Sequence, residues 1–82
     1  MAEENLECVI RDRDTGAKSP AYRVPGDPED TKALQKLLEE LAKGWHNLPD
    51  HPTWRPRYEM TVKRLDRPSA DEIHVPGLPY DD

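Results

Sequence analysis

The residues of this chain with the richest chemistry are three histidines, one cysteine and many carboxylates. His46, Asp50 and His51 lie close together in the sequence, whereas Cys8 and His74 lie far from them. Zinc sites usually place paired Cys or His ligands at a tight spacing, such as Cys-x2-Cys or His-x3-His. The chain has no such pair, so we predict no metal and no cofactor, with histidines that are solvated or packed against tryptophan.

Acid–base catalysis would need a carboxylate beside a histidine, and Asp50 with His51, or Glu59 with His46, could supply such a pair. The chain has 17 acidic residues, so pairs of this kind arise by chance. It has no glycine-rich phosphate loop, no nucleophile motif and no His-Glu-x-x-His motif. A chain of 82 residues is also small for a buried pocket of a few hundred Å³. We therefore predict no catalytic residues and no enzymatic activity.

The loop over residues 45–58 is the strongest candidate for a contact surface. It contains both tryptophans, two of the three histidines and three of the nine prolines. Trp, Tyr and Arg are enriched in interface hot spots, and prolines limit the entropy that a loop loses on ordering. We expect Trp45 and Leu48 to pack under the end of a helix. The residues that we expect to contact a protein partner from an exposed position are His51, Trp54, Arg55 and Arg57.

A nucleic-acid interface, with RNA or single-stranded DNA as the ligand, is the main alternative. From Trp54 to Arg67 the chain has five basic residues against two acidic ones, with Trp54 and Tyr58 interleaved. Aromatic rings can stack on bases while neighbouring arginines neutralise phosphates. The net charge of −5 opposes this reading, because nucleic-acid-binding domains usually carry a basic face. A phage-type inhibitor that mimics nucleic acid is a further, less favoured alternative. It would need acidic residues concentrated on one surface, whereas here they are mixed with basic residues along the chain.

The C-terminal segment 76–82 is a second candidate surface. Leu78 and Tyr80 could dock as an extended peptide, and a frayed terminus is the competing interpretation. The segment lacks a terminal Gly-Gly pair, so the conjugation chemistry of ubiquitin-like proteins is not expected. Residues 1–5 and 77–82 are polar or rich in Pro and Gly, and we expect flexible tails there.

The strands that must position these residues follow from the alternation of apolar and polar residues. In the first strand, Leu6, Cys8 and Ile10 face one way, and Val9 makes the other face partly apolar, which favours a central place in a sheet. The four predicted strands cover residues 6–11, 21–24, 57–65 and 72–75. In the later strands, the side chains expected to face the core are Tyr22, Val24, Tyr58, Met60, Val62, Ile73 and Val75, with His74 facing outward.

A helix is predicted between the second and third strands, over about residues 28–43. Its apolar residues recur every three or four positions and form one wide stripe on a helix face. Asp27 is placed to cap the first turn, and Gly44 is placed to end the last one.

The element order is therefore ββαββ, in a single α+β domain over residues 1–82. A lone amphipathic helix needs a sheet to lie on, so we predict a four-stranded sheet with the helix across one face. A β-grasp-like sheet, with the first and last strands parallel in its middle, has this element order. Antiparallel arrangements have it as well, and both stay open.

Composition bounds the function. Leu, Ile, Val and Phe make up about 17% of the chain, below the roughly 20% at which disorder becomes a concern, so the core must be small. The N-terminal residues lack the pattern of a signal peptide, and no apolar run is long enough to span a membrane. We expect a small acidic cytoplasmic protein of bacterial or phage origin. It would be an interaction or regulatory module, and self-association into a homodimer would compensate for the small core.

Overall fold

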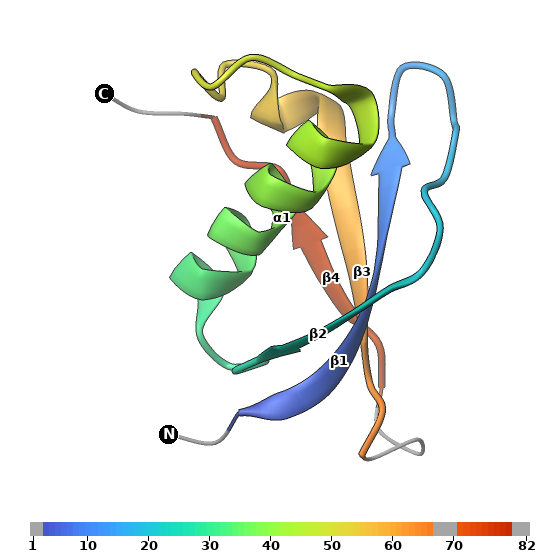
Figure 1. Ribbon diagram of the computed structural model, residues 1–82, viewed down its shortest axis with the longest axis vertical. Coiled ribbons are helices and arrows are strands. Elements are labelled where there is room, and N and C mark those ends of the chain that lie inside the picture. Colours follow the sequence, from blue (N-terminus) through green and yellow to red (C-terminus); the bar gives the residue numbers. More distant parts are fainter. Residues whose placement is uncertain (1–2, 67–70, 80–82) are drawn as a thin grey trace.

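A computed structural model describes residues 3–66 and 71–79 of the chain. One helix lies across one face of a four-stranded sheet, which confirms the predicted α+β class and the ββαββ order (Figure 1). The elements are the strands β1 (Glu4–Asp12), β2 (Tyr22–Gly26), β3 (Tyr58–Arg64) and β4 (Ile73–Pro76), the helix α1 (Thr31–His46) and the short 3-10 helix η1 (Arg55–Arg57).

The sheet is antiparallel, and its strands lie in the order β2-β1-β3-β4. β1 is central, as Val9 predicted, because Cys8 pairs with Tyr22 on one side and with Val62 on the other. The first and last strands are not neighbours, so the sheet is one of the antiparallel alternatives and not a β-grasp sheet. The nine residues of β1 form a longer ladder with the seven of β3 than they could form with the four of β4.

The helix begins and ends three residues later than predicted. Asp30, not Asp27, is the N-cap, and its side chain accepts a hydrogen bond from the Ala33 N–H at 3.1 Å. The Asp27 side chain instead accepts the Glu29 N–H in the preceding turn. At the other end, the helix continues through Gly44 and stops at Asn47, which has a φ of 52°. Asn tolerates this left-handed conformation, and the extra turn carries the apolar stripe on to Trp45.

The core lies between α1 and the sheet. The predicted inward faces of β1 and β3 are buried, and Tyr58 is the largest side chain that is fully buried. Cys8 is the small buried hydrophobe that the alternation predicted, and burial, followed by the nearby Glu7 carboxylate, raises the pKa of its thiol to about 11. The buried apolar side chains are Leu6, Cys8, Ile10, Leu34, Leu38, Ala42, Tyr58, Met60, Val62 and Val75.

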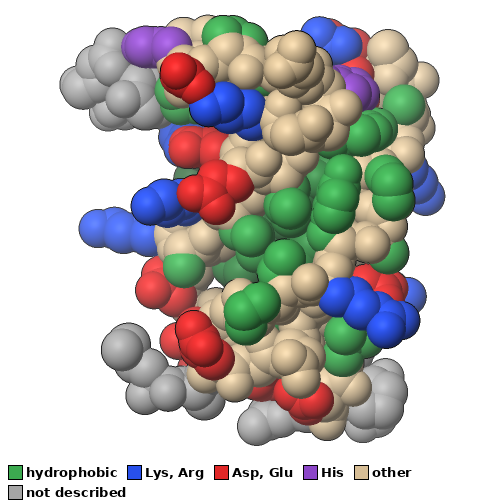
Figure 2. Space-filling model, in the orientation of Figure 1, with side chains coloured by type: hydrophobic (Ala, Val, Ile, Leu, Met, Phe, Trp, Pro, Cys, Tyr) green, Lys and Arg blue, Asp and Glu red, His purple; other side chains and the backbone are tan. Residues whose placement is uncertain are grey.

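The helix does not cover the whole inner face of the sheet. Hydrophobic side chains gather in a band beside it on this face, flanked by charged side chains (Figure 2). No helix in the described part of the chain is long and apolar enough to cross a membrane. The half-buried apolar residues that pack around the core are Tyr22, Val24, Leu37, Leu41, Trp45, Leu48, Trp54 and Ile73.

Candidate functional site

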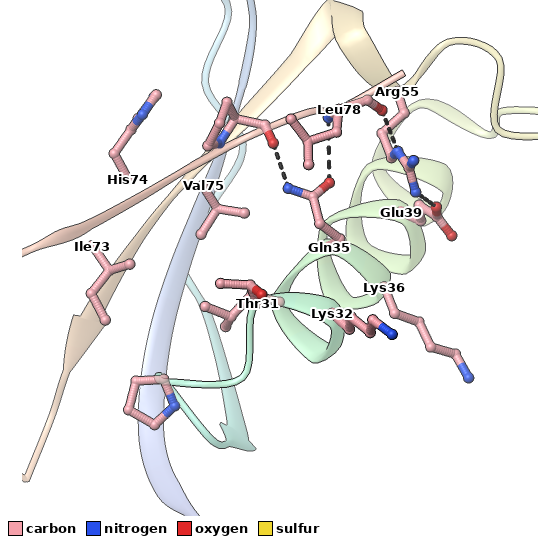
Figure 3. A pocket seen from close by; sticks show the side chains of 13 residues that line it. Thr31, Lys32, Gln35, Lys36, Glu39, Arg55, Ile73, His74, Val75 and Leu78 are labelled. Atoms are coloured by element: carbon pink, nitrogen blue, oxygen red, sulfur yellow. Dashed lines mark hydrogen bonds and ion pairs between the residues drawn. The ribbon is translucent and has the colours of Figure 1, made fainter. Parts of the chain in front are cut away.

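The candidate site is a groove of about 620 Å³ between α1 and the edge strand β4. Leu34 of the helix and Val75 of the strand are both buried beneath it, and Ile73 and Leu78 form apolar walls (Figure 3). Lys32 and Lys36 extend from the helix beyond the groove, and His74 points away from it to the other face of the sheet. The remaining lining residues are Pro28, Thr31, Gln35, Glu39, Arg55 and Pro76.

The sequence did not predict a cavity of this size in so short a chain. The groove exists because a single helix crosses a four-stranded sheet and leaves the edge of β4 uncovered. It is open to solvent, so it is a surface groove and not the buried pocket that the chain was expected to be too small for. The hydrophobic periodicity of α1 or of β4 could not have revealed this groove, because the groove arises from the way in which the helix crosses the sheet.

Backbone groups of β4 add hydrogen-bonding capacity to the groove. The Gly77 N–H donates to the Tyr58 carbonyl of β3 at 3.0 Å. Val75, two residues before Gly77, pairs with Met60 of β3, so the backbone groups of both residues face β3. Because residues of an antiparallel strand alternate in direction, the N–H and C=O of His74 face outward from the sheet edge. Pro76 also faces outward, but proline has a carbonyl and no N–H to offer.

Gln35 occupies the end of this edge. Its side-chain amide donates to the Pro76 carbonyl, and its Oε1 accepts the Leu78 N–H at 3.4 Å (Figure 3). In a parallel ladder, one residue donates its N–H to one residue of the neighbouring strand and accepts the N–H of the residue two positions further on. The Gln35 carboxamide makes the same two bonds, to Pro76 and Leu78, and so satisfies both backbone groups. Gln35 could not be recognised from the sequence, because a glutamine on a helix gives no indication of the residue that it will bond.

Arg55 closes the same end of the groove from η1. Its guanidinium pairs with Glu39 of the helix and donates to the carbonyls of Leu78 and Pro79, at 2.9 Å in the latter case. Arg55 was predicted to lie at an exposed position, but its side chain is only 14% exposed. These bonds hold the segment after β4 against the body of the protein.

Gly77 lets this segment approach η1. A Cβ at this position would overlap the carbonyl oxygens of Arg55 and Tyr58, so any larger residue must push the two backbones apart. Gly77 is buried, although it falls in a stretch that the sequence predicted to be a flexible tail. Asn5, in the predicted N-terminal tail, likewise lies within β1. Tyr80, the other residue of the second candidate surface, lies outside the described residues.

Arg57, the next predicted contact residue, forms an ion pair with Asp12. The Arg57 Nε and Nη2 donate to the two Asp12 carboxylate oxygens at 3.0 and 2.8 Å. The Asp12 side chain is 1% exposed, and the Arg57 side chain is 42% exposed. Hydrogen bonding to Arg57, helped by the Asp14 N–H, holds the pKa of Asp12 well below its usual range against the opposing effect of burial.

The aromatic residues of the loop pack inward more than the sequence suggested. Trp54 is half-buried, its indole N–H donates to the Pro49 carbonyl at 3.0 Å, and its ring meets Tyr58 edge-on at 5.7 Å. Trp45 packs against the core, as predicted, and stacks on His46 at 3.8 Å. The His46 Nδ1 in turn lies 2.8 Å from the Tyr58 hydroxyl. These contacts assign most of the loop's aromatic surface to the protein itself.

The remaining predicted contact residue, His51, lies outside the groove. His51 is exposed on the loop before η1. On the open face of the sheet, His74 and Arg11 both bond Glu59, at 2.8 and 2.9 Å, and these bonds lower the pKa of that carboxylate. Among the described residues, no group of three or more His, Cys, Asp or Glu side chains could hold a metal ion.

The residues of the proposed nucleic-acid strip do not form one exposed surface. Tyr58 is buried on the helix side of β3, whereas Lys63 lies on the opposite face and pairs with Glu72 at 3.5 Å. Arg67 lies outside the described residues. Because Tyr58 is buried and Arg57, which lies over its ring, pairs with Asp12, the geometry does not favour stacking on Tyr58 beside phosphate contacts.

No protein-family model, no curated protein and no solved structure matches this chain.

Proposed function

We propose that this protein is an interaction module that binds an extended segment of a partner protein in the groove between α1 and β4. The observation that carries the proposal is an apolar groove of about 620 Å³ beside an edge strand whose His74 N–H and C=O face outward. In strand addition, main-chain hydrogen bonds supply affinity, and alternate side chains of the ligand fill the pockets beside the sheet. The apolar floor and walls of the groove, formed by Leu34, Val75, Ile73 and Leu78, support binding rather than catalysis.

The charges around the groove indicate the chemistry of the ligand. Glu39 pairs with Arg55 and His74 with Glu59, whereas neither Lys32 nor Lys36 forms an ion pair within the described part of the chain. Their flexible stems can turn the ammonium groups toward a ligand at the mouth of the groove. We therefore expect a segment whose groove-facing residues, at alternate positions, are apolar beside Ile73 and Leu78 and acidic where they reach Lys32 or Lys36. The expected cytoplasmic setting and regulatory role rest on the sequence alone.

The test compares the two large apolar side chains that are most exposed in the described chain. Leu78, at 50% exposure, lines the groove, and Leu65, at 36%, lies outside it. Random displayed peptides of about ten residues, enough for one strand, are selected on the wild-type protein. Enriched peptides should bind Leu78→Asp about tenfold or more weakly by fluorescence anisotropy, because Leu78→Asp removes an apolar wall and adds a repelling charge.

The Leu65→Asp variant is the matched control and should bind the enriched peptides as the wild type does. Equal binding by all three proteins would place the peptides elsewhere and overturn the proposal. Failure to enrich any peptide would also count against it. Circular dichroism on each variant separates lost binding from lost folding.

A further inference from the structure

We infer that a segment bound in this groove runs antiparallel to β4 and that its ladder stops at Gln35. This inference rests on the proposed function, and it adds the direction and the limit of the bound segment. It depends on which backbone groups of β4 face outward from the sheet. Those groups belong to His74, with both an N–H and a C=O facing outward, and to Pro76, with a C=O only.

The two strand directions use these groups differently. In a parallel ladder, each ligand residue bonds two different residues of the edge, the C=O of one and the N–H of the next outward residue. A ligand residue that took the His74 C=O would then need an N–H at Pro76, which proline lacks. In an antiparallel ladder, both bonds go to His74, whose N–H and C=O are both present. The antiparallel direction therefore leaves no ligand carbonyl unpaired at this position.

Gln35 sets the limit of the ladder. Its carboxamide already bonds the Pro76 carbonyl and the Leu78 N–H, so a ligand strand cannot extend past His74 without displacing it. Arg55 holds the carbonyls that follow, on Leu78 and Pro79. In the antiparallel direction, the N-terminal end of the ligand lies beside Gln35 and its C-terminal end lies beside Ile73. Gln35 is thus a positioning residue for the ligand.

Nitroxide labels on an enriched peptide test the direction. A label at the peptide's N-terminus should broaden the backbone amide signals of Gly77 and Leu78 in the protein, and a label at its C-terminus should broaden that of Ile73. The reverse pattern would overturn the inference and leave the proposed function intact. Equal broadening from both labels would also overturn the inference, because it would mean that the segment has no fixed direction. Broadening away from the groove would overturn the inference and the proposed function together.

The limit at Gln35 has its own readout. The Gln35→Ala variant frees the Pro76 carbonyl, so a peptide lengthened by two residues at its N-terminus should gain about fivefold in affinity over the parent peptide, as expected for about one added hydrogen bond. The wild type should bind both peptides equally. Glu40→Ala changes an exposed residue of the same helix outside the groove and should behave as the wild type does. A gain from the longer peptide in the wild type would contradict the role of Gln35.

Discussion

Two arginines that looked like contact residues serve the protein's own fold. Arg is frequent in interfaces because its planar fork binds two acceptors at once, and the same property suits it to internal pairs. Arg57 uses both sides of its fork on Asp12. Arg55 joins the helix, η1 and the segment after β4. The type of a residue therefore indicates which hydrogen bonds and ion pairs its side chain can form, but not which residue it will form them with.

The Asp12–Arg57 pair predicts an asymmetry between two variants. Arg57→Met leaves a buried carboxylate without its cation, so it should lower the urea midpoint at pH 7 more than Asp12→Asn does. Asp12→Asn leaves Arg57, which is 42% exposed and can be hydrated by water. Equal losses in the two variants would mean that the burial of Asp12 carries no energetic weight.

The same pair predicts the sign of the acid dependence. The Arg57 guanidinium holds the pKa of Asp12 below its unfolded value of about 3.9, so its contribution to stability is complete above about pH 4 and is lost as the pH falls toward the folded pKa. In Arg57→Met the carboxylate is buried without its cation, which raises its pKa, so part of the lost stability should return on acidification. Urea titrations of both proteins from pH 7 to about pH 3 measure this difference.

At the scale of the elements, two glycines predict opposite effects of the same substitution. Gly44 lies inside α1 with open space around its Cα, so Gly44→Ala should stabilise the protein by about 0.5–1 kcal/mol. Gly77 lies against the backbone of η1, so Gly77→Ala should cost about 2 kcal/mol or more. Urea denaturation followed by tryptophan fluorescence measures both. A neutral Gly77→Ala would show that the segment after β4 is not held as described.

At the scale of the whole molecule, both edges of the sheet carry a proline. Pro25 in β2 and Pro76 in β4 each occupy a position where a missing N–H faces outward. Unpaired edges invite pairing with other chains, and proline blunts them. Each edge still has one residue whose N–H and C=O both face outward, Arg23 in β2 and His74 in β4, and the one in β4 lies beside the groove.

Restoring an N–H on the β2 edge should promote association between molecules. We expect Pro25→Val to raise the weight-average mass in sedimentation velocity in a concentration-dependent way, because two β2 edges can then pair. Ala21→Val adds similar apolar bulk just outside β2 and should not change the mass. Association of both variants to the same extent would assign the effect to hydrophobicity and not to the edge.

The sequence by itself determined the elements of this protein. The alternation of Leu6, Cys8 and Ile10, and the wide apolar stripe of the helix, act over a few neighbouring residues, so the class, the element order and most of the core could be predicted from them. The helix ends were misplaced because Asp27 and Asp30 are both good N-caps locally, and because Asn as well as Gly can adopt the left-handed conformation that ends a helix, as Asn47 does.

Only the tertiary structure decided the strand order, the presence of the groove and the bonding partners of the polar side chains. Backbone hydrogen bonds are chemically the same for every strand, so periodicity cannot say that β4 pairs with β3 at an edge. Gln35 meets Pro76 across 41 positions of sequence, and Arg57 meets Asp12 across 45. Such pairs depend on how the helix crosses the sheet, and no local pattern in the chain encodes that geometry.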